Sequence, residues 1–318
     1  MFGVIGSGFG LYGHLPAIAQ SGPEPVLLPE RYLSTFKKRS ELAAFEKQVR
    51  WVKDEQALLQ EADSITISTW PQGQQVLIND CLIQAHIKYL VLEKPIAVSP
   101  ALSKDLMEAL MRSGKTFRIN YTFLDVPWYH KLNALAGSSN VKSIHVSWNF
   151  MAHHYKHNLS TWKRINTLGG GAIRFYGIHF IAVLCALNFN KVSASVTDCF
   201  DNEDCFKWAA TFSNASHTPF TVSVDSHAQS QEFTIRVLYT GKEQTDEEMT
   251  ISMQDPFSDA PPSSLSLDPR VEGLKGMYAS LNDEMQNASL YNTYSAVNTL
   301  WADIEILNKQ RTVQKTIS

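Results

Sequence analysis

The stretch Met1-Phe2-Gly3-Val4-Ile5-Gly6-Ser7-Gly8-Phe9-Gly10-Leu11-Tyr12-Gly13-His14 places glycines where an apolar strand turns into a helix. Glycines at such a turn let a pyrophosphate approach the backbone N–H groups at the start of the helix. The third glycine of the usual dinucleotide-binding pattern would fall on Leu11, so the contact between helix and strand must differ here. A glycine-rich turn that binds nothing is the alternative, but a second strand–helix unit follows, which favours a dinucleotide. We expect the contacts from Gly6, Gly8, Phe9 and Gly10.

The end of the second expected strand, Leu28-Pro29-Glu30-Arg31, bears on the choice of cofactor. A carboxylate at this point, here Glu30, binds the ribose hydroxyls of NAD, whereas an adjacent guanidinium, here Arg31, can hold the 2′-phosphate of NADP. Both residue types are present, so the sequence predicts NAD or NADP without deciding between them.

The pattern of strands and helices changes near residue 122. Before it, short β-branched runs alternate with helical patterns, which indicates a parallel sheet. After it, long alternating runs indicate a large, mostly antiparallel open sheet. We therefore predict an α/β protein with a Rossmann domain over 1–121 and an α+β domain over 122–318. The expected strands of the first domain are 2–5, 25–28, 50–52, 64–68, 89–92 and 116–121, and its expected helices are 54–61, 75–85 and 102–112. The expected strands of the second are 141–150, 191–197, 207–212, 220–224 and 232–239, followed by a loop over 254–269 and helices over 271–310.

Length and composition restrict the class of protein. A chain of 318 residues predicts two domains. Its 44% hydrophobic and 19% charged residues are those of a globular protein, and a net charge of -3 argues against nucleic acid as the main partner. We find no secretory leader pattern and no apolar stretch of about 18 residues, so we expect a cytoplasmic protein without a membrane span. Neither CxxC spacing nor a high cysteine density occurs, so we expect four reduced thiols, at Cys81, Cys185, Cys199 and Cys205.

Two further stretches carry candidate chemistry. Leu92-Glu93-Lys94-Pro95 ends the fifth expected strand, where ligands of open α/β sheets gather, although a Lys-Pro at a strand end is usually only a turn. A triple glycine opens the apolar stretch 168–179, which contains His179. A lone histidine on an apolar helix is more often a core residue than a catalyst.

The three stretches in this order resemble the glucose-fructose oxidoreductase / inositol dehydrogenase / MocA (Gfo/Idh/MocA) family of NAD(P)-dependent oxidoreductases over nearly the whole chain. The glycine turn with His14-Leu15-Pro16 is similar to the family's opening, Glu93-Lys94-Pro95 to its EKP signature, and residues 169–179 to its GGGxxxDxGxH helix. The resemblance implies that Lys94 touches substrate and cofactor, that His179 takes the hydroxyl proton, and that the substrate lies between the two domains. It also implies cofactor contacts from Glu93, Thr69 and Trp70.

The chain departs from the family pattern at several of these positions. The helix aspartate falls on Phe175, and the acidic residue three after the histidine falls on Ala182. The usual Thr-Pro-Pro is Thr69-Trp70-Pro71, and an arginine common after the sixth strand is Leu124. With a carboxylate replaced by a ring, His179 would be the principal acid/base, near the ordinary histidine pKa of about 6.5.

These residues predict hydride transfer between a nicotinamide and a secondary hydroxyl or ketone of a sugar, cyclitol or sugar nucleotide. Lys94 and His179 supply the donor and the proton acceptor that this reaction needs. Tyr121 and Tyr176 are candidates for substrate contact, with ordinary packing as the alternative. The alternative from another functional class is a dinucleotide-binding sensor or regulatory protein that has lost its catalytic activity. The replacement of the family's aspartate by Phe175 motivates this alternative.

Two expectations concern metals and partners. His153 and His157 would share a helical face, but without an acidic or cysteine ligand nearby we prefer a polar loop at the substrate mouth to a metal site, with His154 in the same loop. Apolar side chains of 141–150 and 220–224 that helices leave uncovered predict a homodimer or homotetramer.

Overall fold

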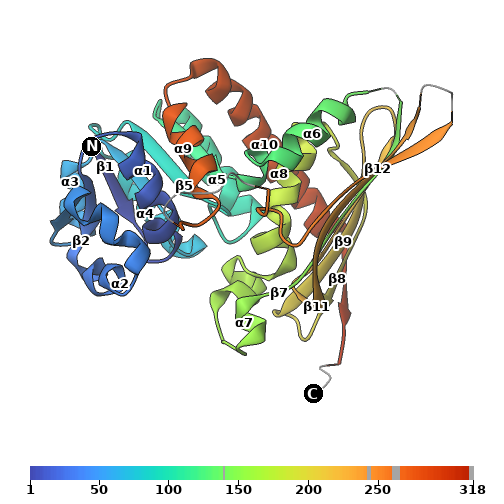
Figure 1. The fold of residues 1–318 in the computed structure, drawn as a ribbon, viewed down its shortest axis with the longest axis horizontal. Coiled ribbons are helices and arrows are strands. Elements are labelled where there is room, and N and C mark those ends of the chain that lie inside the picture. Colours follow the sequence, from blue (N-terminus) through green and yellow to red (C-terminus); the bar gives the residue numbers. More distant parts are fainter. Residues whose placement is uncertain (139, 242–244, 260–265, 315–318) are drawn as a thin grey trace. The chain divides into compact units, whose positions relative to one another are not determined.

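Residues 1–138, 140–241, 245–259 and 266–314 are described by the structure, a computed structural model (Figure 1). The chain divides into two units. The first contains Met1–Ala97, Asp105–Thr122 and Ala260–Asn292, and the second contains Val98–Lys104, Phe123–Asp259 and Thr293–Ser318. Residues 260–265 of the loop expected over 254–269 lie outside the described residues.

The first unit is built on a six-stranded sheet of order β3-β2-β1-β4-β5-β6, in which every pairing is parallel. Strands β1, β2 and β5 are nearly continuous apolar runs, as is typical of a parallel sheet whose two faces are covered by helices. The order reverses between β1 and β4, and ligands of such sheets bind outside the carboxyl ends of the strands at that point. This confirms the predicted Rossmann fold. The strands are β1 Phe2–Ile5, β2 Val26–Pro29, β3 Val49–Val52, β4 Ser64–Ile67, β5 Tyr89–Glu93 and β6 Thr116–Asn120.

The helices of the first unit begin at local sequence signals. The Asp54 side chain accepts a hydrogen bond of 2.9 Å from the Ala57 N–H and caps α3. Pro71 occupies the first position of α4, so that helix starts four residues before the expected 75. The helical segments are η1 Gly10–His14, α1 Leu15–Ser21, η2 Glu30–Tyr32, α2 Leu33–Lys37, η3 Ser40–Gln48, α3 Glu55–Glu61, α4 Pro71–Leu82, α5 Pro100–Arg112 and α9 Val271–Ala279.

Helix α9 shows that the chain returns to the first unit after the second sheet. Val271, Leu274 and Tyr278 are buried in the same apolar cluster as Leu11 and Leu15. The compact units therefore differ from the expected ranges, which place all residues after 121 in the second domain. The difference arises because an apolar helix face joins whichever core completes it, whatever its position in the sequence.

The second unit contains a seven-stranded sheet of order β12-β11-β7-β10-β9-β8-β13. Its pairings are antiparallel except β10 with β7 and β13 with β8, so the predicted large, mostly antiparallel sheet is confirmed. The edge strands β12 and β13 were not predicted, because both are polar and largely exposed, and β13 begins at the end of the stretch 271–310 expected to be helical. The strands are β7 Val141–Met151, β8 Lys191–Cys199, β9 Cys205–Ser213, β10 Pro219–Asp225, β11 His227–Thr240, β12 Asp246–Met253 and β13 Asn308–Thr312.

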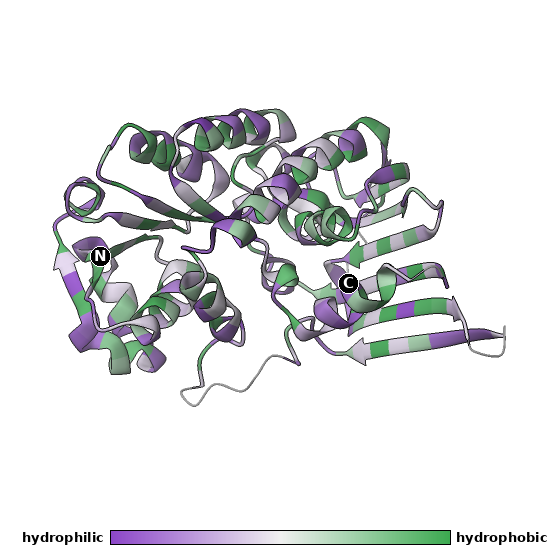
Figure 2. Cartoon of the chain, turned by 90° about the horizontal axis from the view of Figure 1, so that it is seen from above, coloured by the Kyte–Doolittle hydropathy of each residue, from purple (hydrophilic) through white to green (hydrophobic). Residues whose placement is uncertain are grey.

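Apolar residues alternate with polar ones along these strands (Figure 2). The apolar set is buried, including Ile144, Val146, Phe220, Val222 and Val224. The alternate positions of β7 and β10 are mostly polar, such as His145, Ser147, Thr221 and Ser223. Most of the apolar side chains that we expected to be uncovered on these two strands are therefore buried, whereas Phe150 is half-buried. The helices of this unit are α6 Pro127–Ala136, α7 His153–Lys156, α8 Ile178–Ala186 and the part of α10 (Glu284–Leu307) from residue 293 onward.

The apolar segment Asn166–Ala186 bears on the membrane question. By length and composition alone it could cross a membrane, and 78% of its apolar window is buried inside the structure. The core helix of a soluble protein meets the same criterion. Sequence analysis did not find this segment, and the expectation of a protein without a membrane span stays a prediction.

Two of the four cysteines are not free thiols. Cys199 and Cys205 form a disulfide, and the other two, Cys81 and Cys185, are free and buried. The expectation of four reduced thiols was wrong for this pair, because the register of β8 and β9 places residues 199 and 205 opposite each other. Sequence spacing alone does not reveal that register.

Candidate functional site

The glycine turn after β1 has the shape that a dinucleotide requires. Gly6 has a φ of +144°, and a Cβ there would lie 2.1 Å from the Ser68 carbonyl oxygen, so only glycine fits. A Cβ on Gly8 would meet nothing within 4 Å, which leaves its face of the turn open to a ligand. The helix starts here, since the N–H groups of Leu11 and Tyr12 both donate to the Gly8 carbonyl. A diphosphate can therefore approach the backbone closely at Gly8.

Gly13 explains the departure from the usual glycine spacing. A Cβ at Gly13 would lie 2.3 Å from the ring of Phe9, so this glycine makes room for the phenyl group that follows Gly8. Gly10 lies close to β1 and β4, because a Cβ there would be 3.2 Å from Val4 and 3.4 Å from Ser68. The two glycines together replace the single third glycine that the pattern predicts at Leu11.

Glu30 and Arg31 follow β2, as expected, and both are exposed. Arg31 forms an ion pair with Glu55 and donates a hydrogen bond of 2.9 Å to the Tyr32 hydroxyl. A 2′-phosphate at Arg31 would have to share the guanidinium with Glu55. The geometry thus leaves both NAD and NADP possible.

Thr69 and Trp70 follow β4, at the same edge of the sheet. The Trp70 side chain is 41% exposed, and it lies against Gly73, where a Cβ would be 2.8 Å from the indole nitrogen. Thr69 is half-buried. The expected cofactor contacts of both residues remain predictions.

The Glu93 carboxylate, directly before Lys94, is held by residues far away in the sequence. Its Oε1 accepts a hydrogen bond of 2.6 Å from the Asn120 amide and lies 2.8 Å from His14 Nε2. The Gln74 amide bonds both the Glu93 N–H and the Glu93 carbonyl, at 3.0 and 2.5 Å. Burial raises the pKa of Glu93, but the hydrogen bonds from His14 and Asn120 and the charge of Lys94 outweigh it, so the pKa lies below its usual value. Glu93 is therefore an anion beside Lys94, and the Lys94–Pro95 peptide is cis.

The buried His14 side chain joins this carboxylate to a second chain of hydrogen bonds. His14 Nδ1 lies 2.8 Å from the Tyr278 hydroxyl, which lies 2.8 Å from Thr66 Oγ1. With Nε2–H donating to Glu93, Nδ1 accepts from Tyr278, and the Tyr278 hydroxyl accepts from Thr66. Sequence analysis placed His14 in the family's opening without a role, and nothing in the sequence pointed to Tyr278.

Tyr176 and His179 lie in the second unit, on the helical segment that follows the triple glycine. Gly169 and Gly171 have φ angles of +86° and +79°, and a Cβ on Gly170 would lie 2.2 Å from the Trp162 carbonyl. The turn therefore needs all three glycines. The helical segment η7 Ala172–Gly177 carries Tyr176 and leads into α8, which carries His179.

His179 is buried, with 7% of its surface exposed, and its ring stacks on Phe123 with centroids 4.7 Å apart. Tyr176 is partly exposed and packs edge-on against Trp148 and Phe150. Burial raises the pKa of Tyr176, so its hydroxyl stays protonated at neutral pH.

Phe175 stands where the family pattern has an aspartate, and its ring contacts Trp162 and Lys163. The indole of Trp162 packs edge-on against the Phe175 ring at 5.3 Å, and the Lys163 ammonium lies 5.1 Å above it. An aromatic ring and a cation thus occupy the region where the family pattern predicts a carboxylate.

The histidine-rich stretch forms the short helix α7 His153–Lys156 rather than the expected loop. The rings of His153 and His157 are 4.5 Å apart, whereas His154 is buried. Burial, followed by the charges of Lys163 and Arg164, lowers the pKa of His154 to about 4. In the described part of the chain, no group of three or more His, Cys, Asp or Glu side chains could hold a metal ion.

The expected site residues are distributed over the two units. The glycine turn, Thr69, Trp70, Glu93 and Lys94 all lie in the first unit, together with Tyr121, which is 3% exposed. Tyr176 and His179 lie in the second unit.

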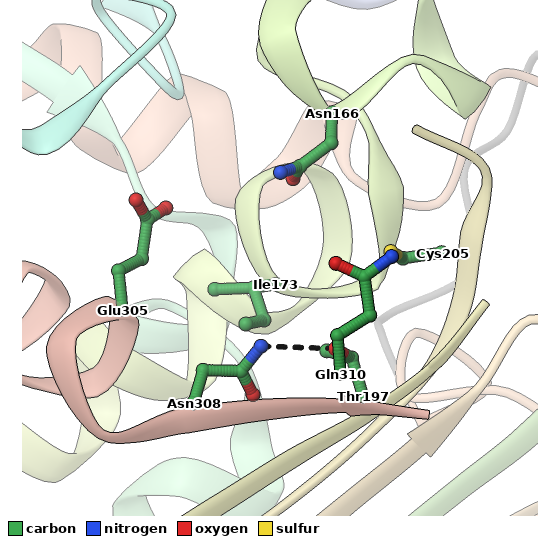
Figure 3. A pocket seen from close by; sticks show the side chains of 7 residues that line it. All are labelled: Asn166, Ile173, Thr197, Cys205, Glu305, Asn308 and Gln310. Carbon is green, nitrogen blue, oxygen red and sulfur yellow. Dashed lines mark hydrogen bonds between the residues drawn. The ribbon is translucent and has the colours of Figure 1, made fainter. Parts of the chain in front are cut away.

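The second unit also contains a cavity of about 220 Å³ (Figure 3). Most of its lining is already bonded: Glu305 pairs with Arg174 at 2.7 Å, and the Asn308 amide donates to the Thr197 hydroxyl at 2.9 Å. The cavity lies at the start of η7 and along β13. The lining residues are Asn166, Ile173, Thr197, Cys205, Glu305, Asn308 and Gln310.

A parallel sheet that reverses its order beside a glycine turn defines a dinucleotide-binding Rossmann domain. Residues 1–121 match the model of the GFO_IDH_MocA oxidoreductase family, which describes an NAD-binding Rossmann fold. The match is to this part of the chain, which is less than half of its 318 residues. The match confirms the family resemblance seen in the sequence, and it confirms the expectation of NAD or NADP as the cofactor.

Solved structures of similar fold cover nearly the whole chain. KijD10, a 3-ketoreductase from Actinomadura kijaniata in complex with NADP and TDP-benzene, is 14% identical, with a TM-score of 0.70 and 98% of each chain covered. The WlbA dehydrogenase from Chromobacterium violaceum, in complex with NADH and UDP-GlcNAcA, is 13% identical, with a TM-score of 0.68 and coverage of 96% of this chain and 92% of that one. A super-repressor mutant of Gal80p from Saccharomyces cerevisiae is 13% identical, with a TM-score of 0.67 and coverage of 96% and 94%. No curated protein sequence matches the chain significantly.

Proposed function

We propose that the protein is an NAD(P)-dependent oxidoreductase that transfers a hydride between the nicotinamide and a secondary hydroxyl or ketone of a sugar, cyclitol or sugar nucleotide. The observation that carries this proposal is the Lys94 ammonium next to the anchored Glu93 carboxylate at the carboxyl end of β5, in the domain that matches an NAD-binding family. Two structures of the same fold, KijD10 and WlbA, are described with a nicotinamide cofactor and a nucleotide-linked ligand, which supports a carbohydrate-like substrate.

The glycine turn fits the cofactor. Gly6 permits the close approach of β1 to β4, and Gly8 leaves its face of the turn open. The nicotinamide, when bound, supplies the hydride acceptor or donor. Glu30 or Arg31 would hold the adenosine ribose or its phosphate, and Thr69 and Trp70 would line the cofactor farther along the sheet edge.

Proton transfer and charge stabilisation are the proposed roles of His179 and Lys94. A hydroxyl that loses a hydride must also lose its proton, and the neutral His179 imidazole is the base that accepts it. The Lys94 ammonium donates a hydrogen bond to the same oxygen and stabilises its developing negative charge. Glu93, fixed by His14, Asn120 and Gln74, holds the backbone of Lys94 in place, and Tyr121 and Tyr176 are proposed substrate contacts.

The test combines cofactor binding with turnover. Purified protein should quench or enhance NADH or NADPH fluorescence on binding, and it should oxidise or reduce the nicotinamide with a member of a panel of sugars, cyclitols and sugar nucleotides. Lys94→Ala should lower both kcat and substrate affinity, because the ammonium contacts the ground state and the transition state. No binding of either dinucleotide would refute the proposal.

A second candidate function, a dinucleotide-binding sensor or regulator, is favoured by Phe175 and its surroundings. A ring with Trp162 on its edge and Lys163 above it has replaced a carboxylate of the family pattern. Gal80p, which has the same fold and is described as a super-repressor mutant, supports this candidate. Tight NADH binding without turnover of any panel member would favour the sensor over the enzyme.

We further propose a homo-oligomeric, cytoplasmic protein whose second unit, which contains Phe123–Asp259, binds the substrate. The open face of β7 and β10 carries small polar groups such as Ser147, Thr221 and Ser223, so an interface there would be polar and hydrogen-bonded. Light scattering at micromolar concentration tests this: a monomer would refute it.

A further inference from the structure

Arg270, at the start of α9, lies on the ring of Phe9. The centre of its guanidinium is 4.0 Å from the ring centroid, which is a cation–π contact. Phe9 directly follows Gly8 in the glycine turn. The segment that returns from the second sheet thus places a positive charge beside the open face of that turn.

Hydrogen bonds and a ring contact fix the position of this guanidinium. Asp268 Oδ1 accepts hydrogen bonds from the Arg270 N–H at 3.0 Å and from its Nε at 2.8 Å, and Asp268 Oδ2 accepts from Nη2 at 2.8 Å. Phe9 is in turn seated on Gly13, where a side chain would overlap its ring. The guanidinium is held from two sides, yet 28% of the Arg270 side chain is exposed and accessible to a ligand.

The guanidinium itself supplies the positive charge that an anionic ligand needs. Burial lowers the pKa of Arg270, but the bonds and charge of Asp268 outweigh it and keep the group charged. A planar guanidinium recognises phosphate oxygens in pairs, which an ammonium cannot do. A diphosphate carries two negative charges and, by the proposed function, lies over Gly8, one residue before Phe9.

We propose that Arg270 binds the diphosphate of the nicotinamide dinucleotide, so that the cofactor site is completed by a segment about 260 residues away in the sequence from the glycine turn. This inference rests on the proposed function and adds to it a cofactor-binding residue that lies outside the stretch 1–121 matched by the family model. Cofactor binding should therefore depend on whether the start of α9 is docked on the turn.

The experiment measures dissociation constants by calorimetry or NADH fluorescence for wild type and three variants. Arg270→Gln should weaken NADH and ADP binding about 10- to 100-fold, the range for charge-assisted hydrogen bonds, and leave adenosine binding within about twofold. Arg270→Lys keeps the charge but not the planar fork, so its loss should be intermediate. Arg39→Gln is the matched control, because Arg39 also lies over an aromatic ring of this turn, Tyr12 at 4.6 Å, and is also paired with a nearby acid, Glu41. Its effect on NADH binding should stay within about threefold.

A double variant separates lost attraction from new repulsion. Removing Arg270 alone leaves the Asp268 carboxylate beside the diphosphate, where it would repel the ligand. Asp268→Asn/Arg270→Gln removes that charge, and the loss of NADH affinity should persist. Recovery to within twofold of wild type would overturn the proposal, as would an unchanged NADH affinity of folded Arg270→Gln protein or an equal loss for adenosine.

The outcomes also distinguish this inference from the proposed function. If wild type binds NADH, Gly8→Val abolishes binding and Arg270→Gln does not change it, only the role of Arg270 is refuted. If wild type binds neither NADH nor NADPH, both proposals are refuted.

Discussion

The Nε2 atom of His14 lies 2.8 Å from Oε1 of Glu93, so the residue that ends the glycine turn also anchors the carboxylate next to Lys94. One imidazole thereby connects the expected cofactor-binding turn to the expected catalytic lysine. The same ring lies 2.8 Å from the Tyr278 hydroxyl on α9. The geometry of Lys94 therefore depends on three separate parts of the chain.

The first prediction concerns His14. His14→Leu removes one hydrogen bond from Glu93 and one from Tyr278, which keep Asn120 and Thr66 as partners, and each lost bond costs about 1–3 kcal/mol. We expect a clear fall in Tm by calorimetry. His86→Leu, which affects an exposed histidine bonded to the Leu59 carbonyl, should change Tm much less. Equal shifts for the two variants would contradict the role of His14 in the network.

The second prediction tests the glycine turn. Gly8→Val puts a branched side chain into the open space where the diphosphate must approach, so dinucleotide binding should be lost while the fold is kept. Gly22→Val is the matched control, because a Cβ there also meets nothing within 4 Å but Gly22 lies at the other end of α1. If calorimetry showed unchanged NADH affinity in folded Gly8→Val protein, the prediction would be wrong.

The third prediction concerns the choice between NAD and NADP. If Arg31 reaches the 2′-phosphate, Arg31→Ala should weaken NADP binding by roughly tenfold or more and NAD binding little, because only NADP loses a charge-assisted contact. Arg50→Ala removes another exposed ion-paired arginine, from β3, and should affect neither cofactor. An equal loss of NAD and NADP affinity would assign Arg31 to its contacts with Glu55 and Tyr32 instead.

The fourth prediction concerns proton transfer by His179. His179→Ala should lower kcat by about 10²- to 10⁴-fold and leave NADH affinity nearly unchanged, as for a positioned proton carrier. In the oxidative direction the wild-type rate should rise with pH through one ionisation, because the imidazole must be neutral to accept a proton. His145→Ala, which removes a hydrogen bond to the Thr221 hydroxyl on the second sheet, is the control, and we expect wild-type turnover from it. Survival of the ionisation in His179→Ala protein would transfer the role to Lys94 or Tyr176.

The fifth prediction is a pH dependence of stability from His154. Its pKa is about 4 in the folded protein, against about 6.5 when unfolded, so the unfolded state binds the extra proton between these values. Stability is therefore complete above about pH 6.5 and falls as the pH drops toward 4, by about 2 kcal/mol at pH 5. In chemical denaturation, His154→Gln should lose correspondingly less stability than wild type between pH 7 and pH 5. A parallel loss in both proteins would show that His154 does not titrate in this way.

The local sequence was sufficient for much of the fold. The parallel sheet, the glycine turn and the mostly antiparallel second sheet all follow from apolar runs, alternation and glycine placement, each of which is read within a few residues. The polar edge strands β12 and β13 escaped prediction, because edge strands lack the apolar pattern that marks buried ones. The sequence shows that Phe175 replaces the carboxylate of the family pattern. Only the structure shows that Trp162 and Lys163 lie against the Phe175 ring.

The sequence by itself determined which residues carry the candidate chemistry, because a glycine turn, a lysine after a strand and a histidine after a triple glycine are local features. Only the tertiary structure decided what surrounds them. The contact of His14 with Tyr278, the stacking of Arg270 on Phe9 and the pairing of Cys199 with Cys205 depend on which helix completes a core and on the register of two strands. Such contacts are set by the packing of apolar surface across the whole chain, which no short stretch of sequence encodes.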